Sequence, residues 1–229
     1  MKQGLFLTVI FLNVFTLTVR AEDTQLYAQW PLTNSLFSSA GAVNLFPYGG
    51  GVKLSDSAAI FGAGAVELGD ITLFGTPMLD VAEGITVTGW IKPKVIEEGF
   101  SKTAPHTLIY FYDSKDRGKT QFIFRILDGK LSAFNAEPAK NIYSSFATTE
   151  DEWSFFAFVL KSDAVDIYLN QYPPQTTAIS NNYKYDRIYV GAMNTDLARP
   201  YRGLMKQLRL YNYALDAKNI LSIYEEESD

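Results

Sequence analysis

The chain has 229 residues, a net charge of −5 at neutral pH, no cysteine and a single histidine. The excess of acidic residues argues against nucleic acid or an anionic membrane surface as the partner. The absence of cysteine excludes thiolate zinc sites and cysteine nucleophiles. A single histidine excludes a zinc site built on two or three histidines.

The first 21 residues have the pattern of a secretory signal peptide. Lys2 gives a positive start, an apolar run covers residues 4–19, and Val19 and Ala21 supply the small residues expected before a cleavage site. A membrane anchor is the weaker interpretation, because the run is shorter than the ~20 residues that span a bilayer and polar residues interrupt it. The sequence therefore predicts secretion, no membrane insertion, and one mature domain over residues 22–229, since β-sandwiches often form single units of about 200–250 residues.

Short alternating segments separated by turn residues predict many strands. Residues 108–112 and 155–160 are apolar on both faces, which is typical of central strands covered by two layers. Residues 121–126 and 165–170 alternate between apolar and polar side chains, as a strand with one buried face does. The Asp128-Gly129 pair between two such runs predicts a two-residue hairpin, because both turn positions need positive φ.

One helix is expected, at the C-terminus. Asp216 is a suitable N-cap, and apolar residues recur with helical spacing from Ala217 to Tyr224. The acidic residues 225–227 follow directly and oppose the helix dipole, so this end is expected to fray in solvent. Many strands followed by one short helix favour an all-β sandwich of the jelly-roll type.

Several segments resemble, in the family's own order, the strands of laminin-G-like, concanavalin A-like jelly-roll domains. The most specific are residues 85–93, ITVTGWIKP, which resemble the family's Thr–x–x–x–Trp–hydrophobic–Lys–Pro strand, and residues 208–215, LRLYNYAL. The other matching segments are residues 26–32, 65–70, 152–157, 166–170, 188–192 and 201–204. The three tryptophans fall on family positions and are interpreted as core packing: Trp30, Trp90 and Trp153. The resemblance implies a concanavalin A-like jelly-roll β-sandwich with a short C-terminal helix, but a fold does not settle function.

Catalysis is not expected. Glucanases of this superfamily carry two catalytic carboxylates on one strand as Glu-x-Asp-x-x-Glu, and no such string occurs here. The acidic run at residues 150–152 is interpreted as a solvated loop. His106 is interpreted as a surface loop residue before a strand, and the glycines at residues 49–51 as a turn without the Lys-Ser/Thr of a phosphate loop.

Two loops carry the candidate ligand-binding residues. Polar side chains beside an aromatic ring suit a sugar, whose hydroxyls need hydrogen bonds and whose C–H face packs on a ring. The candidates in the first loop are Asp113 and Asp116, and those in the second are Asn194, Asp196, Arg199 and Tyr201.

Calcium is the one cofactor that the sequence leaves open, because the same loops supply oxygen donors. The basic residues between 115 and 119 oppose a divalent cation, and Lys206-Gln207 stands where the family has an acidic pair. Ordinary Asx-turns are the competing interpretation of these aspartates.

The leading hypothesis is a secreted, non-catalytic module that binds an extracellular glycan or protein. A structural component of the extracellular matrix and, less favoured, a glycoside hydrolase of the same fold are the alternatives. Two carboxylates facing each other in a groove would favour the hydrolase, and an exposed apolar patch or edge strand would favour the matrix component.

Overall fold

The computed structural model describes residues 26–40, 43–48, 51–62, 65–68, 79–94, 105–116, 119–193 and 198–228. The predicted signal peptide therefore lies outside the described residues, as do Asn194, Asp196 and two of the three glycines at residues 49–51. No helix in the described ranges is long and apolar enough to cross a bilayer.

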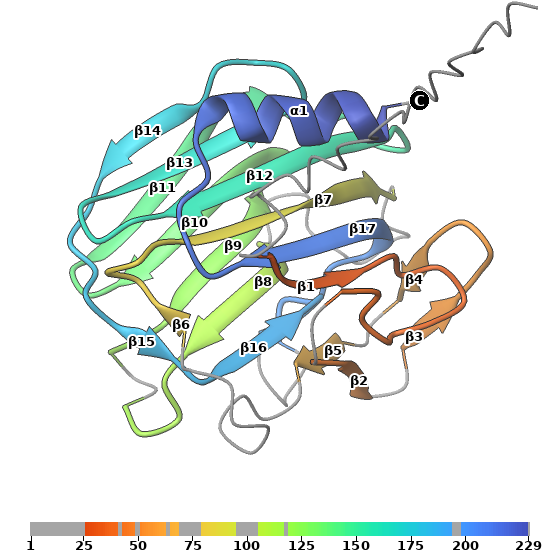
Figure 1. The fold of residues 1–229 in the computed structure, drawn as a ribbon, viewed down its shortest axis with the longest axis horizontal. Helices are drawn as coiled ribbons and strands as arrows, with labels where there is room; N and C mark the ends of the chain where they lie inside the picture. Colours follow the sequence, from red (N-terminus) through yellow and green to blue (C-terminus); the bar gives the residue numbers. More distant parts are fainter. Residues whose placement is uncertain are drawn as a thin grey trace, which may run out of the picture.

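The described chain is an antiparallel β-sandwich with one helix (Figure 1). Its strands are β1 (Leu26–Trp30), β2 (Leu45–Tyr48), β3 (Val52–Leu54), β4 (Ala59–Phe61), β5 (Ala65–Leu68), β6 (Leu79–Asp80), β7 (Ile85–Pro93), β8 (His106–Tyr112), β9 (Phe122–Leu127), β10 (Lys130–Ala136), β11 (Ala139–Ala147), β12 (Ser154–Leu160), β13 (Ala164–Leu169), β14 (Gln175–Ala178), β15 (Lys184–Tyr185), β16 (Arg187–Val190) and β17 (Gly203–Tyr211). The helix is α1 (Ala217–Glu227). The all-β fold with a short C-terminal helix is confirmed.

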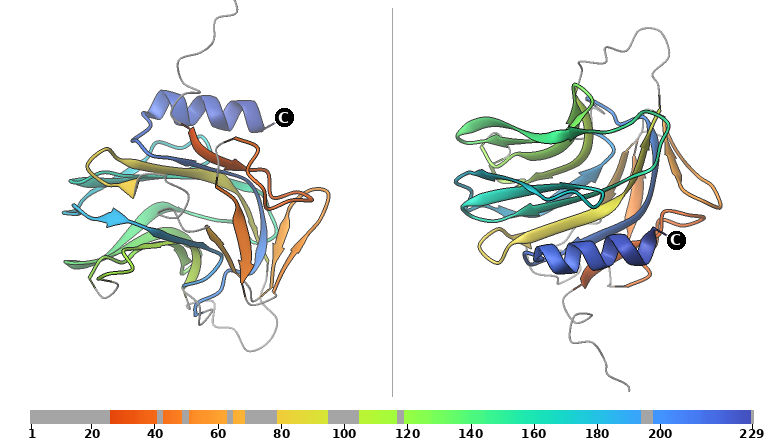
Figure 2. Two further views of the ribbon diagram at one scale, coloured as in Figure 1. Left: turned by 60° about the horizontal axis from the view of Figure 1, so that its bottom comes forward. Right: turned by 90° about the horizontal axis from the view of Figure 1, so that it is seen from above.

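Two large sheets form the layers. One has the order β14-β13-β12-β7-β17-β4-β3, with β1 also paired to β17, and the other has the order β11-β10-β9-β8-β16-β5-β2. The small pair β15-β6 lies beside them. Figure 2 shows the two large sheets face to face, with α1 on the outer side of the first.

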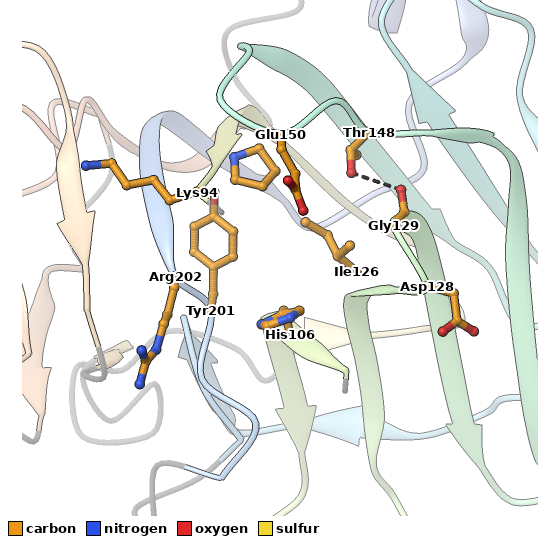
Figure 3. A pocket seen from close by; sticks show the side chains of 10 residues that line it. Lys94, His106, Ile126, Asp128, Gly129, Thr148, Glu150, Tyr201 and Arg202 are labelled. Atoms are coloured by element: carbon orange, nitrogen blue, oxygen red, sulfur yellow. Dashed lines mark hydrogen bonds between the residues drawn. The ribbon is translucent and has the colours of Figure 1, made fainter. Parts of the chain in front are cut away.

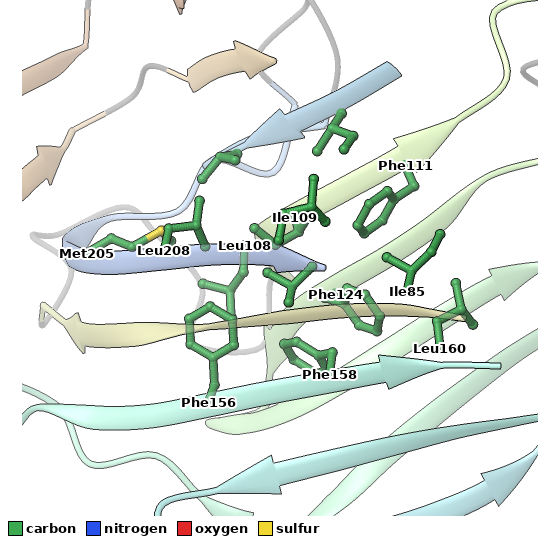
Figure 4. Packing of buried hydrophobic residues seen from close by; sticks show 14 of the residues in the cluster. Ile85, Leu108, Ile109, Phe111, Phe124, Phe156, Phe158, Leu160, Met205 and Leu208 are labelled. Carbon is green, nitrogen blue, oxygen red and sulfur yellow. The ribbon is translucent and has the colours of Figure 1, made fainter. Parts of the chain in front are cut away.

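The main core lies between the two sheets and is built from the inward positions of their strands (Figure 4). Phe124 of β9 stacks on Phe158 of β12 with ring centroids 4.0 Å apart, which joins the layers directly. The Asp128-Gly129 hairpin is confirmed, with φ values of 53° and 72° that set the β9–β10 register. Trp30 is buried in this core, and its Nε1 donates to the carbonyl of Val43 at 2.9 Å.

A second apolar layer explains why residues 155–160 are apolar on both faces. Phe156 and Phe158 point into the main core, whereas Phe155 packs under α1 beside Trp90 and Ile220. The prediction of a central strand covered twice is therefore confirmed for β12, all of whose residues are buried.

The C-terminal end of α1 departs from the sequence expectation. The helix forms as predicted, with the Asp216 carboxylate accepting from the backbone N–H of Asn219 at 2.8 Å. Glu227, however, is only 7 % exposed; it accepts from Trp90 Nε1 at 2.8 Å and pairs with Arg209 at 2.7 Å. The expectation of a frayed, solvated end is wrong for Glu227, because β7 and β17 supply partners that outweigh the unfavourable helix dipole.

Candidate functional site

A cleft of about 360 Å³ opens at one end of the sandwich, where five segments meet (Figure 3). It lies at the end of β7, the start of β8, the β9–β10 turn, the loop between β11 and β12, and the approach to β17. Its lining residues are Pro93, Lys94, His106, Ile126, Asp128, Gly129, Thr148, Glu150, Tyr201 and Arg202. Ligand pockets are typically ~300–1,000 Å³, so this cleft is of a size for a small ligand or one short segment of a larger one.

His106 forms part of the cleft floor because of an irregularity in β8. The pairing register between β8 and β9 shifts between Thr107 and Ile109, and this shift places His106 opposite Ile126, on the inward face. His106 is 8 % exposed and is the first residue of a strand, so its interpretation as a surface loop residue is wrong.

The hydrogen bonding of His106 defines its tautomer. Nδ1 lies 3.2 Å from the carbonyl oxygen of Pro200, and a carbonyl only accepts, so Nδ1 carries the proton and Nε2 the lone pair. Burial lowers the pKa of His106, and the charge of Arg202 lowers it further. The ring is therefore neutral near pH 7 and presents an acceptor nitrogen rather than a charge.

Tyr201 forms a fixed wall of the cleft. The side chain is fully buried, its hydroxyl donates to the carbonyl of Leu204 at 3.0 Å, and burial raises its pKa far above the ordinary value. Gly203 makes this packing possible: with φ of +148°, a Cβ there would lie 2.4 Å from the Lys92 carbonyl oxygen and 2.6 Å from the Tyr201 hydroxyl. Tyr201 therefore supports the cleft wall from behind: its ring is buried and its hydroxyl is already committed.

Polar groups surround this floor from two sides. Thr148 is held in place because its backbone N–H and its hydroxyl both donate to the Gly129 carbonyl, at 2.8 and 3.0 Å. Figure 3 shows Glu150 pointing into the cleft between the two sides, with Lys94 and Arg202 on the Tyr201 side. A partly apolar floor with a polar rim can hold a polar ligand by ring packing and hydrogen bonds.

The arrangement lacks the geometry of a glycoside hydrolase in the part of the chain that the structure describes. Asp128 and Glu150 both line the cleft, but both are exposed, and Asp128 points away from Glu150. Catalysis of this type needs two carboxylates directed at one glycosidic bond. The acidic run at residues 150–152 is an exposed turn, as expected.

The sequence candidates do not gather at one place. Asp113 follows the last residue of β8, whereas the carbonyl of Arg199 accepts from Thr107 N–H near the first residue of that strand. Seven strand residues span roughly 20 Å, so Asp113 and Asp116 lie at the opposite end of β8 from Arg199 and Tyr201. Of the four candidates that the structure describes, Asp113, Asp116, Arg199 and Tyr201, only Tyr201 lines the cleft.

The Asp113 carboxylate closes its own turn. It accepts from the backbone N–H of Lys115 at 2.8 Å, and the carbonyl of Asp113 accepts from the N–H of Asp116 at 3.2 Å. This is the Asx-turn weighed against calcium in the sequence. Among the described residues, no group of three or more acidic or histidine side chains is placed to hold a metal ion.

Sequence reasoning missed most of the cleft lining. Tyr201, a candidate from the sequence, and His106, as the only histidine, were the residues with a visible signal, while Ile126, Thr148 and Glu150 read as ordinary strand and loop positions. Asp128 and Gly129 were recognised for the hairpin that they form and not as part of a cleft.

Comparison with known proteins decides the family. The model of the concanavalin A-like lectin/glucanase superfamily, in its laminin-G form, matches residues 62–221. The chain belongs to this superfamily. A search for curated relatives of similar sequence found no match.

Solved structures share the superfamily fold at low sequence identity. Domain 4 of AbnA, an extracellular arabinanase from Geobacillus stearothermophilus, solved with arabinotriose, has a TM-score of 0.61 and 17 % identity over 87 % of this chain and 98 % of that domain. The receptor-binding domain of botulinum neurotoxin mosaic serotype C/D has a TM-score of 0.64 and 14 % identity over 90 % of this chain. The binding domain of botulinum neurotoxin DC in complex with rat synaptotagmin II has the same TM-score and identity over 89 % of this chain. This chain spans about half the length of the toxin domains, 52 % in each case. At 14–17 % identity, these likenesses show the shared fold and no particular role.

Proposed function

We propose that this protein is a secreted, non-catalytic module that binds an extracellular glycan in the cleft between β7, β8 and the β9–β10 turn. The observation that carries the proposal is the cleft itself, with the His106 ring and Ile126 as floor and the Glu150 carboxylate directed inward. A sugar needs a ring to pack on and hydrogen-bond partners for its hydroxyls, and the cleft offers both. The arabinotriose bound to a domain of the same fold supports this ligand class.

Binding to a glycan array tests the proposal directly, with residues 22–229 expressed as the mature protein. Calcium is present in one set of arrays and a chelator in the other, because calcium dependence would locate a metal at the ligand. We expect a defined sugar to bind in both sets, since the cleft holds hydrogen-bonding groups of its own. Loss of binding in chelator would instead favour the calcium alternative.

Two matched substitutions assign the binding to the cleft. Glu150→Gln removes a charge that points into the cleft, and Glu152→Gln removes the same charge from an exposed position of the same turn that does not line it. A hydrogen bond to a charged group contributes about 1.5–3 kcal/mol, so Glu150→Gln should weaken sugar binding by about tenfold or more. Glu152→Gln should leave it unchanged. Arrays that stay silent in both conditions would exclude the lectin function and leave an extracellular protein as the ligand.

Secretion is proposed from the N-terminal pattern alone. Expression of the full chain in a secreting host, followed by N-terminal sequencing of the protein in the medium, should give a start at residue 22. Retention of residues 1–21 in a membrane fraction would contradict it.

A structural role in the extracellular matrix is the second candidate. Exposed apolar side chains lie on the terminal strand of each large sheet, Phe46 on β2 and Leu54 on β3. Exposed apolar side chains on terminal strands favour association with another chain. Sedimentation of the mature protein over a hundredfold concentration range should show self-association if this role holds, and a monomer throughout would exclude assembly through these edges.

A further inference from the structure

Arg125 lies on the outer face of the sheet that contains β8 and β9, away from the main core. The residues before and after it, Phe124 and Ile126, belong to the core, so alternation along β9 turns Arg125 to the other side. Thr107 of β8 is its direct cross-strand partner. Pro200 forms a parallel bridge with Thr107, and Thr107 N–H donates to the Arg199 carbonyl at 2.9 Å, so the segment of Arg199 runs next to this pair.

Arg125 is buried without a counter-charge. It is 4 % exposed, its Nη2 donates to the neutral amide oxygen of Asn141 at 2.6 Å, and its guanidinium lies 5.4 Å from the centre of the Phe134 ring. Its Nε has no hydrogen-bond partner, and the hydroxyl of the neighbouring Thr107 has none either. Across the described ranges, no carboxylate forms an ion pair with Arg125 or Arg199.

A second cation lies near this group, because the Arg199 backbone runs beside Thr107, the cross-strand partner of Arg125. Burial lowers the pKa of Arg125, and the charge of Arg199 lowers it further, so the two guanidinium groups lie close enough to repel one another. Arg199 is exposed and has a positive φ of 53°, a strained backbone state for a residue other than glycine. A buried cation normally requires a paired carboxylate, because desolvation of an ion costs several kcal/mol. Among the described residues, Arg125 has a second positive charge nearby and no such carboxylate.

We propose that Arg125 and Arg199 bind the anionic group of an acidic sugar, a carboxylate or a sulfate. The planar guanidinium groups match the geometry of either oxyanion and can donate in parallel pairs. Tyr143 belongs to the same face, through the register that pairs Arg125 with Ser132 and Ser132 with Tyr143, and its ring is 43 % exposed. The ring gives the sugar a surface for packing beside its charged group.

This inference goes beyond the proposed cleft function and does not require it. The arginine pair and the cleft are carried by the same strands on opposite faces, because Ile126 lines the cleft and Arg125 does not. A glycan bound only in the cleft would be affected by Glu150→Gln and not by a change at Arg199. Failure of either proposal can therefore be recognised separately.

The experiment is an NMR titration of the mature protein labelled with ¹⁵N, in which the arginine side-chain Nε–H signals are followed. The probes are methyl β-glucuronide, glucose 6-sulfate and the neutral methyl β-glucoside. Both acidic sugars should shift the Arg125 and Arg199 signals, with a dissociation constant on the order of 1 mM, and the neutral sugar should not. Preference for one acidic sugar identifies whether the carboxylate or the sulfate is the source of the anion.

Matched substitutions complete the test. Arg199→Gln removes an exposed cation and should weaken binding of the acidic sugars by about tenfold. Arg187→Gln removes a cation from the far end of the same face, where Arg187 already pairs with Asp186, and should have no effect. Arg125→Lys keeps the buried charge but loses the fork of donors, so it should weaken binding in a chain that still folds. Equal shifts with all three sugars, no shift with either acidic sugar, or equal losses in Arg199→Gln and Arg187→Gln would overturn the proposal.

Discussion

Gly203→Ala tests whether the wall of the cleft depends on the absence of a side chain at this position. The new methyl carbon would lie 2.4 Å from the Lys92 carbonyl oxygen and 2.6 Å from the Tyr201 hydroxyl, both far inside normal contact. The Lys92 carbonyl belongs to β7, which pairs with β17 at this point, and Tyr201 is fully buried. Neither neighbour can move without disturbing the sheet or the cleft.

Gly129→Ala is the matched control for the loss of unfolding free energy expected in Gly203→Ala. Gly129 also has positive φ, +72°, but nothing lies within 4 Å of a Cβ built there. The Gly129→Ala variant should lose about 1–2 kcal/mol of unfolding free energy, which is the cost of a left-handed backbone for alanine. Gly203→Ala carries a comparable backbone cost and adds overpacking of about 1–3 kcal/mol, so its total should be about 2–5 kcal/mol.

Urea unfolding of the mature protein measures both free energies, and unchanged m-values would show that only stability has altered. For a chain of this size, each kcal/mol lowers the melting temperature by about 2–4 °C, so a loss of about 3 kcal/mol corresponds to roughly 6–12 °C. Gly203→Ala should also weaken binding in the cleft, because a displaced Tyr201 would move the cleft lining. Equal destabilisation of the two variants within about 0.5 kcal/mol would refute the clash as the cause.

Two further predictions concern buried ionisable groups. Glu227→Ala leaves Arg209 without its carboxylate partner and should lower the free energy of unfolding by about 2–3 kcal/mol. This is less than the usual ~3–5 kcal/mol for a broken buried ion pair, because a helix end can open locally. Glu225→Ala, at an exposed position of the same turn, should change the unfolding free energy by less than about 0.5 kcal/mol, and hydrogen exchange across α1 should show the same contrast. For His106, burial lowers the pKa in the folded state, so the unfolded chain takes up the proton first and stability should fall as pH drops from 7 through about 6.5 and below. His106→Asn should flatten that part of the pH profile in urea unfolding, and an identical profile would contradict the assignment.

Much of the fold could be predicted because strand periodicity is a local property of the sequence. The alternation at residues 121–126, the turn at Asp128-Gly129 and the doubly apolar run at residues 155–160 each describe one element and its covering layers. The family resemblance then predicted that these elements form a jelly-roll sandwich.

The site could not be predicted in the same way because it depends on which ends of the strands meet. The loop with Asp113 looked equivalent to the loop with Arg199, and only the pairing of Thr107 with its neighbours shows that they lie at opposite ends of β8. The shift in register after Thr107, which turns His106 inward, leaves no mark in composition or period. Glu227 was misjudged for a related reason, since its partners Arg209 and Trp90 come from strands distant in the sequence.

The same alternation that made the strands recognisable also places the residues of the two proposed binding surfaces on opposite faces of one sheet. On β8, His106 turns to the cleft while Thr107 stands beside Arg125; on β9, Ile126 turns to the cleft while Arg125 turns outward. Neighbouring residues thus face the cleft on one side and the two arginines on the other. On the outer face of the opposite sheet, α1 covers β7, β12, β13 and β17 through its apolar contacts. A substitution that shifts β8 as a whole should therefore weaken both, whereas side-chain changes at Glu150 or Arg199 should weaken only one.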